Sequence, residues 1–170
     1  MSRRSVAALL TIGAAAALVR SRRRARAGVR GPVGVRLQSW IPGPPGGGPR
    51  RLAAVVWASP VTLAGLLAGL ATGARPRLAH GVVLFAPARG LTGAVIARRG
   101  FAATGLGHVV ISIAEPSPSL LAHELAHVRQ AERLGPFMAP VYLALLAVHG
   151  YQRHPLEIAA RSAAARAGPA

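Results

Sequence analysis

The chain of 170 residues contains no cysteine, no lysine and no aspartate, and its only acidic residues are four glutamates. The absence of cysteine excludes disulfides and thiolate metal sites, so a metal could be held only by His, Glu and water. All 21 basic residues are arginine, and the formal net charge is +17. In a chain also rich in alanine, glycine and proline, this arginine bias is typical of GC-rich codons, so part of the charge reflects base composition.

Aromatic residues are also scarce, at 4% of the chain. Single-stranded nucleic acids are commonly bound by basic surfaces interleaved with aromatic side chains that stack on the bases. Here eleven arginines lie within the first 51 residues, beside apolar segments. This pattern favours contact with anionic lipid headgroups, and nucleic-acid binding through residues 20–51 is a less favoured alternative.

Apolar residues, in contrast, are abundant, at 52% of the chain with a mean hydropathy of +0.40. Residues 52–74 contain no charge and are flanked by arginine on both sides. At roughly 1.5 Å per residue, this run is long enough to cross a hydrocarbon core of about 30 Å. We predict a transmembrane helix over residues 52–74 with a kink at Pro60; a buried core helix is the alternative.

The N-terminal part of the chain is arginine-rich and ends in a Pro/Gly-rich stretch. An apolar run at residues 6–19 lies between arginines but is too short to cross a bilayer comfortably. We interpret residues 1–51 as an anchor or signal-like segment followed by a linker over residues 28–51.

Residues 80–113 contain three short runs rich in β-branched residues, separated by glycine and proline. The runs lie at residues 82–85, 94–97 and 109–113. They predict a short, antiparallel sheet. The last of them could bind an extended peptide by edge pairing, or could be an ordinary core strand.

The C-terminal half carries clear helix boundaries. Ser117 and Pro118 are typical of a helix start, and glycine followed by proline at residues 135–136 ends that helix. We predict helices over residues 118–134, 137–150 and 156–166. The expected fold is therefore α+β, a mostly helical membrane protein. Residues 75–166 are expected to form one domain, with the sheet packed against the 118–134 helix and the helical hairpin that follows.

The sequence His-Glu-Leu-Ala-His at residues 123–127 lies inside the predicted 118–134 helix. Residues four apart share a helix face, so His123 and His127 can bind one metal ion while Glu124 lies beside it. This arrangement indicates a zinc hydrolase site. His80 and His108 are expected to be structural or solvent-facing instead.

A catalytic zinc site needs a third protein ligand. Gln130 and Arg133 occupy the positions of the glycine and third histidine of the longer metzincin motif, which excludes that class. Two glutamates follow the motif. Glu132 is rotated away from the metal-binding face, whereas a returning helix of about 14 residues could bring Glu157 level with His123.

Three segments carry a resemblance to known proteins: HELAHVRQ at residues 123–130, ERLGP at 132–136 and HPLE at 154–157. They resemble a group of small uncharacterised bacterial membrane proteins with an H-E-L-x-H-V-R-Q-x-E-R-x-G-P helix and a following N-P-F-E segment. The resemblance covers roughly residues 52–165. More distantly, the motif is similar to membrane-bound gluzincin peptidases, including the antibiotic-sensor and heat-shock membrane protease families.

The resemblance implies zinc bound by His123, His127 and Glu157, with Glu124 as the catalytic base, in a bacterial cytoplasmic membrane with the side of the domain left open. The expected function is hydrolysis of a peptide or protein substrate by zinc-activated water, in contact with membrane lipid. Candidate donors to the oxyanion, by proximity in sequence only, are Tyr151, His149 and His154.

Two other functions stay open from the sequence. One is a membrane scaffold or sensor in which zinc is structural or vestigial, and a fourth protein ligand at the metal would favour it. The other is a basic protein that binds membrane surfaces or nucleic acid through residues 20–51.

Overall fold

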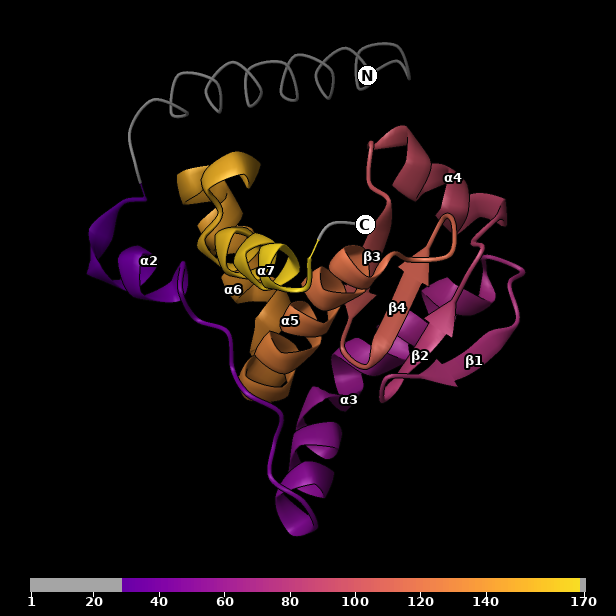
Figure 1. Ribbon diagram of the computed structural model, residues 1–170, viewed down its shortest axis with the longest axis horizontal. Helices are drawn as coiled ribbons and strands as arrows, with labels where there is room; N and C mark the ends of the chain where they lie inside the picture. The colour runs from indigo at the N-terminus through magenta and orange to yellow at the C-terminus, as the bar shows by residue number, and fades with distance from the viewer. Residues whose placement is uncertain (1–28, 169–170) are drawn as a thin grey trace, which may run out of the picture.

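A computed structural model describes residues 29–168 of the chain (Figure 1). Within this range the protein is a mostly helical α+β fold built around one small sheet. The helices are α2 (Gly31–Leu37), α3 (Pro49–Leu70), α4 (Gly90–Arg98), α5 (Pro118–Leu134), α6 (Met138–His149) and α7 (Pro155–Arg166), with short 3-10 turns η1 (Gly135–Phe137) and η2 (Tyr151–Arg153). The strands are β1 (Pro76–Ala79), β2 (Val82–Phe85), β3 (Ala103–Leu106) and β4 (Val109–Ser112).

The sheet has the strand order β1-β2-β4-β3 and mixed direction. Its central pair, β2 and β4, is parallel, while β1 and β3 pair antiparallel with their neighbours. The prediction of a purely antiparallel sheet was therefore wrong. The physical reason lies in the central strands, whose continuous apolar sequences suit burial on both faces, as is usual for parallel strands.

Side chains of the two central strands alternate between two apolar clusters. Phe85, Val109 and Ile111 pack with α3 and α4 on one face of the sheet. Val82, Leu84 and Val110 pack with Val128 of α5 on the other face. This alternation follows from the two-residue period of a strand. The sheet is thereby enclosed between α3 and α4 on one side and α5 on the other.

Two details of the predicted strands differ in the structure. Residues 94–97, predicted as a strand, lie in α4, where Ile96 is buried and Val95 is exposed. A four-residue apolar run cannot distinguish the two states, because a helix also buries only some of its positions. The strand at residues 109–113 is also not an edge strand, since β4 lies between β2 and β3.

Helix α3 begins at Pro49, before the apolar run predicted at residues 52–74, and continues through Pro60. It ends at Leu70, so residues 71–74 lie outside the helix. Its buried face consists of the small residues Ala58, Gly65 and Gly69, which allow the helix to lie directly against the sheet. A Cβ at Gly69 would collide with the ring of Phe85. Helix α3 therefore packs along the domain instead of standing apart from it.

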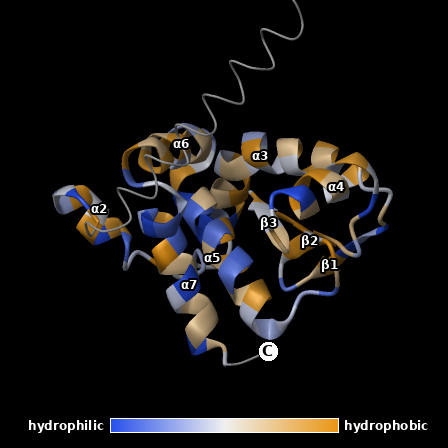
Figure 2. Ribbon diagram, turned by 90° about the horizontal axis from the view of Figure 1, so that it is seen from above, coloured by the Kyte–Doolittle hydropathy of each residue, from blue (hydrophilic) through white to orange (hydrophobic). Residues whose placement is uncertain are grey.

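The outward side of α3 is apolar and exposed, and it continues onto neighbouring helices. Figure 2 shows α6, α3 and α4 along one side of the molecule, with α5 and α7 on the other. Large exposed hydrophobic residues on these three helices include Val56, Leu63, Leu67, Leu91 and Leu143. Two helical stretches, Pro49–Leu70 and Pro118–His149, are long and apolar enough to cross a membrane.

The C-terminal helices follow their predicted boundaries. Ser117 caps α5 by accepting a hydrogen bond from the Leu120 N–H at 3.2 Å, and α5 ends at Leu134. The C-cap, Gly135, has a φ of 54°, and a Cβ there would collide with the indole of Trp57. Helix α3 therefore contacts the C-terminal end of α5, and this contact positions the turn into α6.

The Pro/Gly-rich linker predicted over residues 28–51 carries more structure than expected. It contains α2, and Leu37 and Trp40 pack against a cluster formed by Ala131, Met138 and Leu156. An apolar cluster on α5, α6 and α7 thus holds this segment against the domain. The apolar run predicted at residues 6–19 lies outside the described residues.

Candidate metal centre

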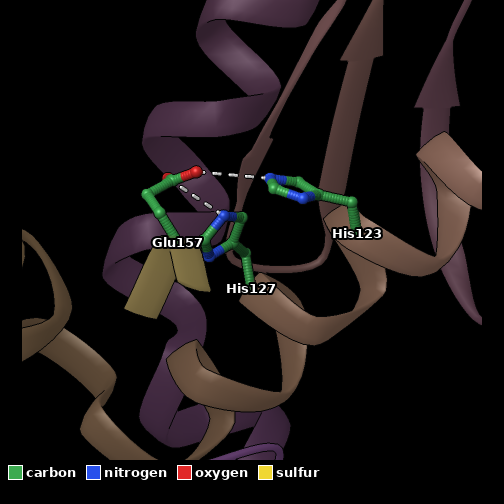
Figure 3. A group of neighbouring side chains, drawn as sticks. All are labelled: His123, His127 and Glu157. Atoms are coloured by element: carbon green, nitrogen blue, oxygen red, sulfur yellow. Dashed lines mark ion pairs between the residues drawn. The ribbon is translucent and has the colours of Figure 1, made fainter. Parts of the chain in front are cut away.

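The described residues contain one group of His, Cys, Asp or Glu side chains close enough to hold a metal ion: His123, His127 and Glu157. The two histidines lie one helical turn apart on α5, and Glu157 lies in the first turn of α7, which packs along α5 (Figure 3). The Nε2 atom of His123 is 3.4 Å from Glu157 Oε2, and the Nε2 atom of His127 is 3.2 Å from Glu157 Oε1.

These distances fit a tetrahedral zinc ion. Zinc binds imidazole nitrogen and carboxylate oxygen at about 2.0–2.1 Å, so two of its ligand atoms lie about 3.3 Å apart. The Glu157 Oε2 atom is buried, and its hydrogen bond from His123 Nε2 is long, at 3.4 Å. A buried carboxylate oxygen with so weak a donor is costly, and a bound cation would compensate that cost. The three side chains therefore suit a zinc ion in donor type, and their ligand atoms all lie within 4.8 Å of one another.

The centre is largely shielded from solvent. The side chains of His123, His127 and Glu157 are 17%, 9% and 5% exposed. Burial raises the pKa of Glu157, but hydrogen bonds from His123 and His127 outweigh it and hold that pKa well below its usual range. Glu157 is consequently ionised over the whole physiological pH range, as a metal ligand must be.

Glu124 lies beside this cluster and is itself buried. Its Oε2 atom has no hydrogen-bond partner. Strand β3 passes close to it, because a Cβ on Gly105 would be 3.0 Å from Glu124 Oε2 and 3.5 Å from the His127 Cβ. A buried oxygen without a donor thus lies next to the candidate metal ligands, where a water or substrate could supply the missing hydrogen bond.

Gln130 is a contributor to this centre that the sequence did not reveal. Its side-chain oxygen lies 2.9 Å from His127 Nδ1, and its Nε2 donates to the carbonyls of Trp40 and Leu156, both at 3.4 Å. A flipped amide would place its oxygen against two carbonyl oxygens, so this orientation is fixed. When His127 is neutral, its proton therefore stays on Nδ1, and the Nε2 lone pair can bind a metal in place of the hydrogen bond to Glu157.

Replacing Gln130 should weaken zinc binding without removing a ligand. We expect Gln130→Ala to lower zinc affinity about ten- to a hundredfold, because His127 loses the group that fixes its tautomer and orientation. Competition with a chromophoric chelator measures this affinity. Gln152→Ala, at an exposed position, is the matched control. Equal affinities for the two variants would show that Gln130 does not act on the metal centre.

The three candidate oxyanion donors lie in different surroundings. Tyr151 interacts electrostatically with the centre. Burial, and then the charge of Glu157, raise its pKa to about 12, which keeps its hydroxyl protonated. His149 lies against α2, where its Nδ1 accepts a hydrogen bond from the Arg30 N–H at 3.5 Å. His154 is fully buried, and burial lowers its pKa.

Tyr142, on α6, is a second contact that sequence reasoning missed. Its hydroxyl donates to Glu157 Oε1 at 2.7 Å. His154 stacks on the Tyr142 ring with centroids 4.1 Å apart, and its Nε2 donates to the Tyr142 carbonyl at 3.0 Å. His154 therefore supports Tyr142, and Tyr142 in turn orients the carboxylate of Glu157.

The remaining histidines and downstream glutamate lie elsewhere. His108 and Glu132 face each other at 3.1 Å, and neither belongs to the group of metal-binding geometry. His80 lies in the β1–β2 turn. Comparison with known proteins gives no family for the chain, since no family model, curated protein or solved structure matches it.

Proposed function

We propose that the protein is a membrane-associated zinc metallopeptidase. The observation that carries this proposal is the buried convergence of His123, His127 and Glu157 within 4.8 Å, with Glu124 beside them. Two imidazoles and one carboxylate form a ligand set typical of catalytic zinc, where a fourth position stays open for water. The proposal also includes the resemblance of the chain to bacterial membrane proteins with an HELxHVRQ motif and, more distantly, to gluzincins.

We assign each side chain a role in hydrolysis from its position. When bound, zinc would lower the pKa of a coordinated water and polarise the substrate carbonyl. Glu124 accepts the proton of the attacking water and passes it to the leaving amine. The protonated hydroxyl of Tyr151 is our candidate donor to the developing oxyanion, and Tyr142 and Gln130 keep the metal ligands in place.

The substrate backbone is best accommodated along β3. Beyond β3 there is no further strand among residues 29–168, and β3 passes over Glu124 at Gly105. An extended peptide that pairs with this strand would lie next to the metal ligands. We therefore propose β3, instead of residues 109–113, as the strand with which a substrate peptide pairs.

A substitution at Gly105 tests the proposed position of β3 beside Glu124. The Cβ added by Gly105→Ala would press on Glu124 and shift it relative to the metal ligands. We expect kcat to fall about ten- to a hundredfold while zinc content is unchanged, because small displacements of catalytic groups are costly. Gly43→Ala, where a Cβ would meet nothing within 4 Å, serves as the control. Unchanged kcat for Gly105→Ala would contradict the proposed closeness of β3 to the reacting groups.

Membrane attachment is assigned to the side formed by α3, α4 and α6. These helices lie along one side of the molecule (Figure 2), and large apolar side chains on them are exposed. Arginines lie at the N-terminal end of α3 and a few residues beyond its C-terminal end. Apolar surface bordered by arginine suits the boundary between hydrocarbon and anionic headgroups. Together with the resemblance to bacterial membrane proteins, this surface supports our proposal that the protein associates with the bacterial cytoplasmic membrane.

Catalysis is favoured over a structural zinc by the number of ligands. Structural zinc is normally bound by four protein side chains. The group found among residues 29–168 has three members, and the neighbouring His149 and His154 make other contacts. An open fourth position is what a hydrolytic water requires.

A peptide-library assay tests the proposed activity directly. Detergent-purified protein is incubated with a diverse peptide mixture, and new termini are identified by mass spectrometry. We expect cleavage that a chelator abolishes and that added zinc restores. A zinc-loaded protein that leaves every peptide intact would favour the non-catalytic scaffold or sensor.

A further inference from the structure

A second cluster of polar side chains lies near the N-terminal end of α3, apart from the metal centre. Arg51, His80, His108, Arg129 and Glu132 line a surface pocket of about 430 Å³ that the Pro/Gly-rich segment before α3 helps to enclose. These five residues come from α3, α5 and the turns between β1 and β2 and between β3 and β4. None of them takes part in the proposed hydrolysis.

The pocket carries an excess of cationic groups. Its one carboxylate, Glu132, has a side chain only 4% exposed and uses its Oε1 atom for both Arg129, at 2.7 Å, and His108, at 3.1 Å. Glu132 therefore fixes these two side chains and neutralises one positive charge. Arg51 forms no ion pair with any of the chain's four glutamates, all of which lie among the described residues.

Arg51 reaches the turn that carries His80, and both residues line the pocket. A Cβ on Gly81 would lie 3.8 Å from Arg51 Nη2, so this guanidinium reaches the β1–β2 turn. The pairing of Ala79 with Val82 leaves His80 and Gly81 as a two-residue turn, with φ values of 53° and 79°. Asparagine is the usual first residue of such a turn. Histidine adopts the left-handed conformation more readily than most residues, and from this turn His80 lines the pocket.

We propose that this pocket binds a phosphate group. His108 is held by Thr62 and Glu132 through its two ring nitrogens. The groups left to face a ligand are Arg51, His80 and Arg129, from three parts of the chain, and they suit a tetrahedral oxyanion with several acceptor oxygens and more than one negative charge. The pocket also includes Val55, which is 40% exposed, so cationic and apolar surface meet there. The phosphate of an anionic phospholipid and free phosphate are the two sources that share this chemistry. The inference does not depend on the proposed peptidase activity.

Calorimetric titration of the full chain with inorganic phosphate, in a non-ionic detergent, tests for the site. We expect saturable binding that Arg51→Gln weakens at least about tenfold, since a charge-assisted contact is lost. His80→Asn should weaken binding while keeping the turn, because asparagine adopts this conformation readily. Arg50→Gln removes the same charge next to the pocket and should leave phosphate affinity unchanged.

Vesicle flotation then distinguishes the two sources. Vesicles of phosphatidylcholine with and without phosphatidylglycerol are compared for the parent and the two arginine variants. Attachment that requires phosphatidylglycerol and that Arg51→Gln weakens more than Arg50→Gln identifies a lipid phosphate. Pocket-dependent binding of inorganic phosphate, without such a difference on vesicles, identifies a soluble phosphate. Binding that is absent in both assays, or that both variants weaken equally, would overturn the proposal.

Discussion

Glu124→Gln is expected to abolish peptide hydrolysis while the protein keeps its zinc. Glutamine matches the shape of the buried Glu124 side chain but cannot accept a proton from water. Loss of a general base typically lowers kcat by about two to four orders of magnitude. Because His123, His127 and Glu157 are unchanged, the zinc content should match that of the parent.

The matched control for this experiment is Glu115→Gln. Glu115 is exposed, pairs with Arg77 and lies outside the metal-binding group, so its replacement should leave both activity and zinc unchanged. Cleavage rates of a library-derived peptide give the comparison. Near-parental hydrolysis by Glu124→Gln would remove Glu124 from the mechanism, whereas loss of zinc in that variant would assign it a binding role.

Replacing Glu157 should abolish the increase in thermal stability that zinc gives the parent protein. Zinc at about a hundred times its Kd stabilises a folded protein by about 2.7 kcal/mol, which raises Tm by roughly 5–10 °C for a chain of this size. We expect this increase for the parent and none for Glu157→Ala, because the carboxylate that faces both imidazoles is gone.

Differential scanning fluorimetry with and without zinc measures the shift. Comparing each protein with its own metal-free form separates loss of the site from general destabilisation caused by the substitution. Glu115→Ala should respond to zinc as the parent does, since Glu115 lies on the exposed surface. A zinc-induced increase retained in Glu157→Ala would exclude Glu157 from the ligand set.

The helices around the metal centre were predictable because their boundaries depend on local chemistry. Ser117, Pro118 and Gly135 define the ends of α5, and the four-residue spacing of His123 and His127 fixes their common face. The proximity of Glu157 followed from helix rise and the length of α6. Such features need only a few neighbouring residues, so a sequence can reveal them.

Long-range contacts were not predictable in the same way. Gln130 and Tyr142 act on the metal ligands through tertiary packing, and neither has a distinctive sequence pattern. The parallel direction of β2 and β4 depends on the connection through α4 and β3, and the short apolar run in α4 resembled a strand. Edge strand β1 was missed because its exposed sequence lacks apolar alternation.

One zinc ion per chain, held by His123, His127 and Glu157, is the condition on which the peptidase proposal depends. Elemental analysis of detergent-purified parent, His123→Ala and Glu157→Ala measures it directly. We predict about one zinc per parent chain and none in either variant, as expected for a three-ligand site. A parent without zinc, or variants that retain it, would contradict the assignment of this metal centre.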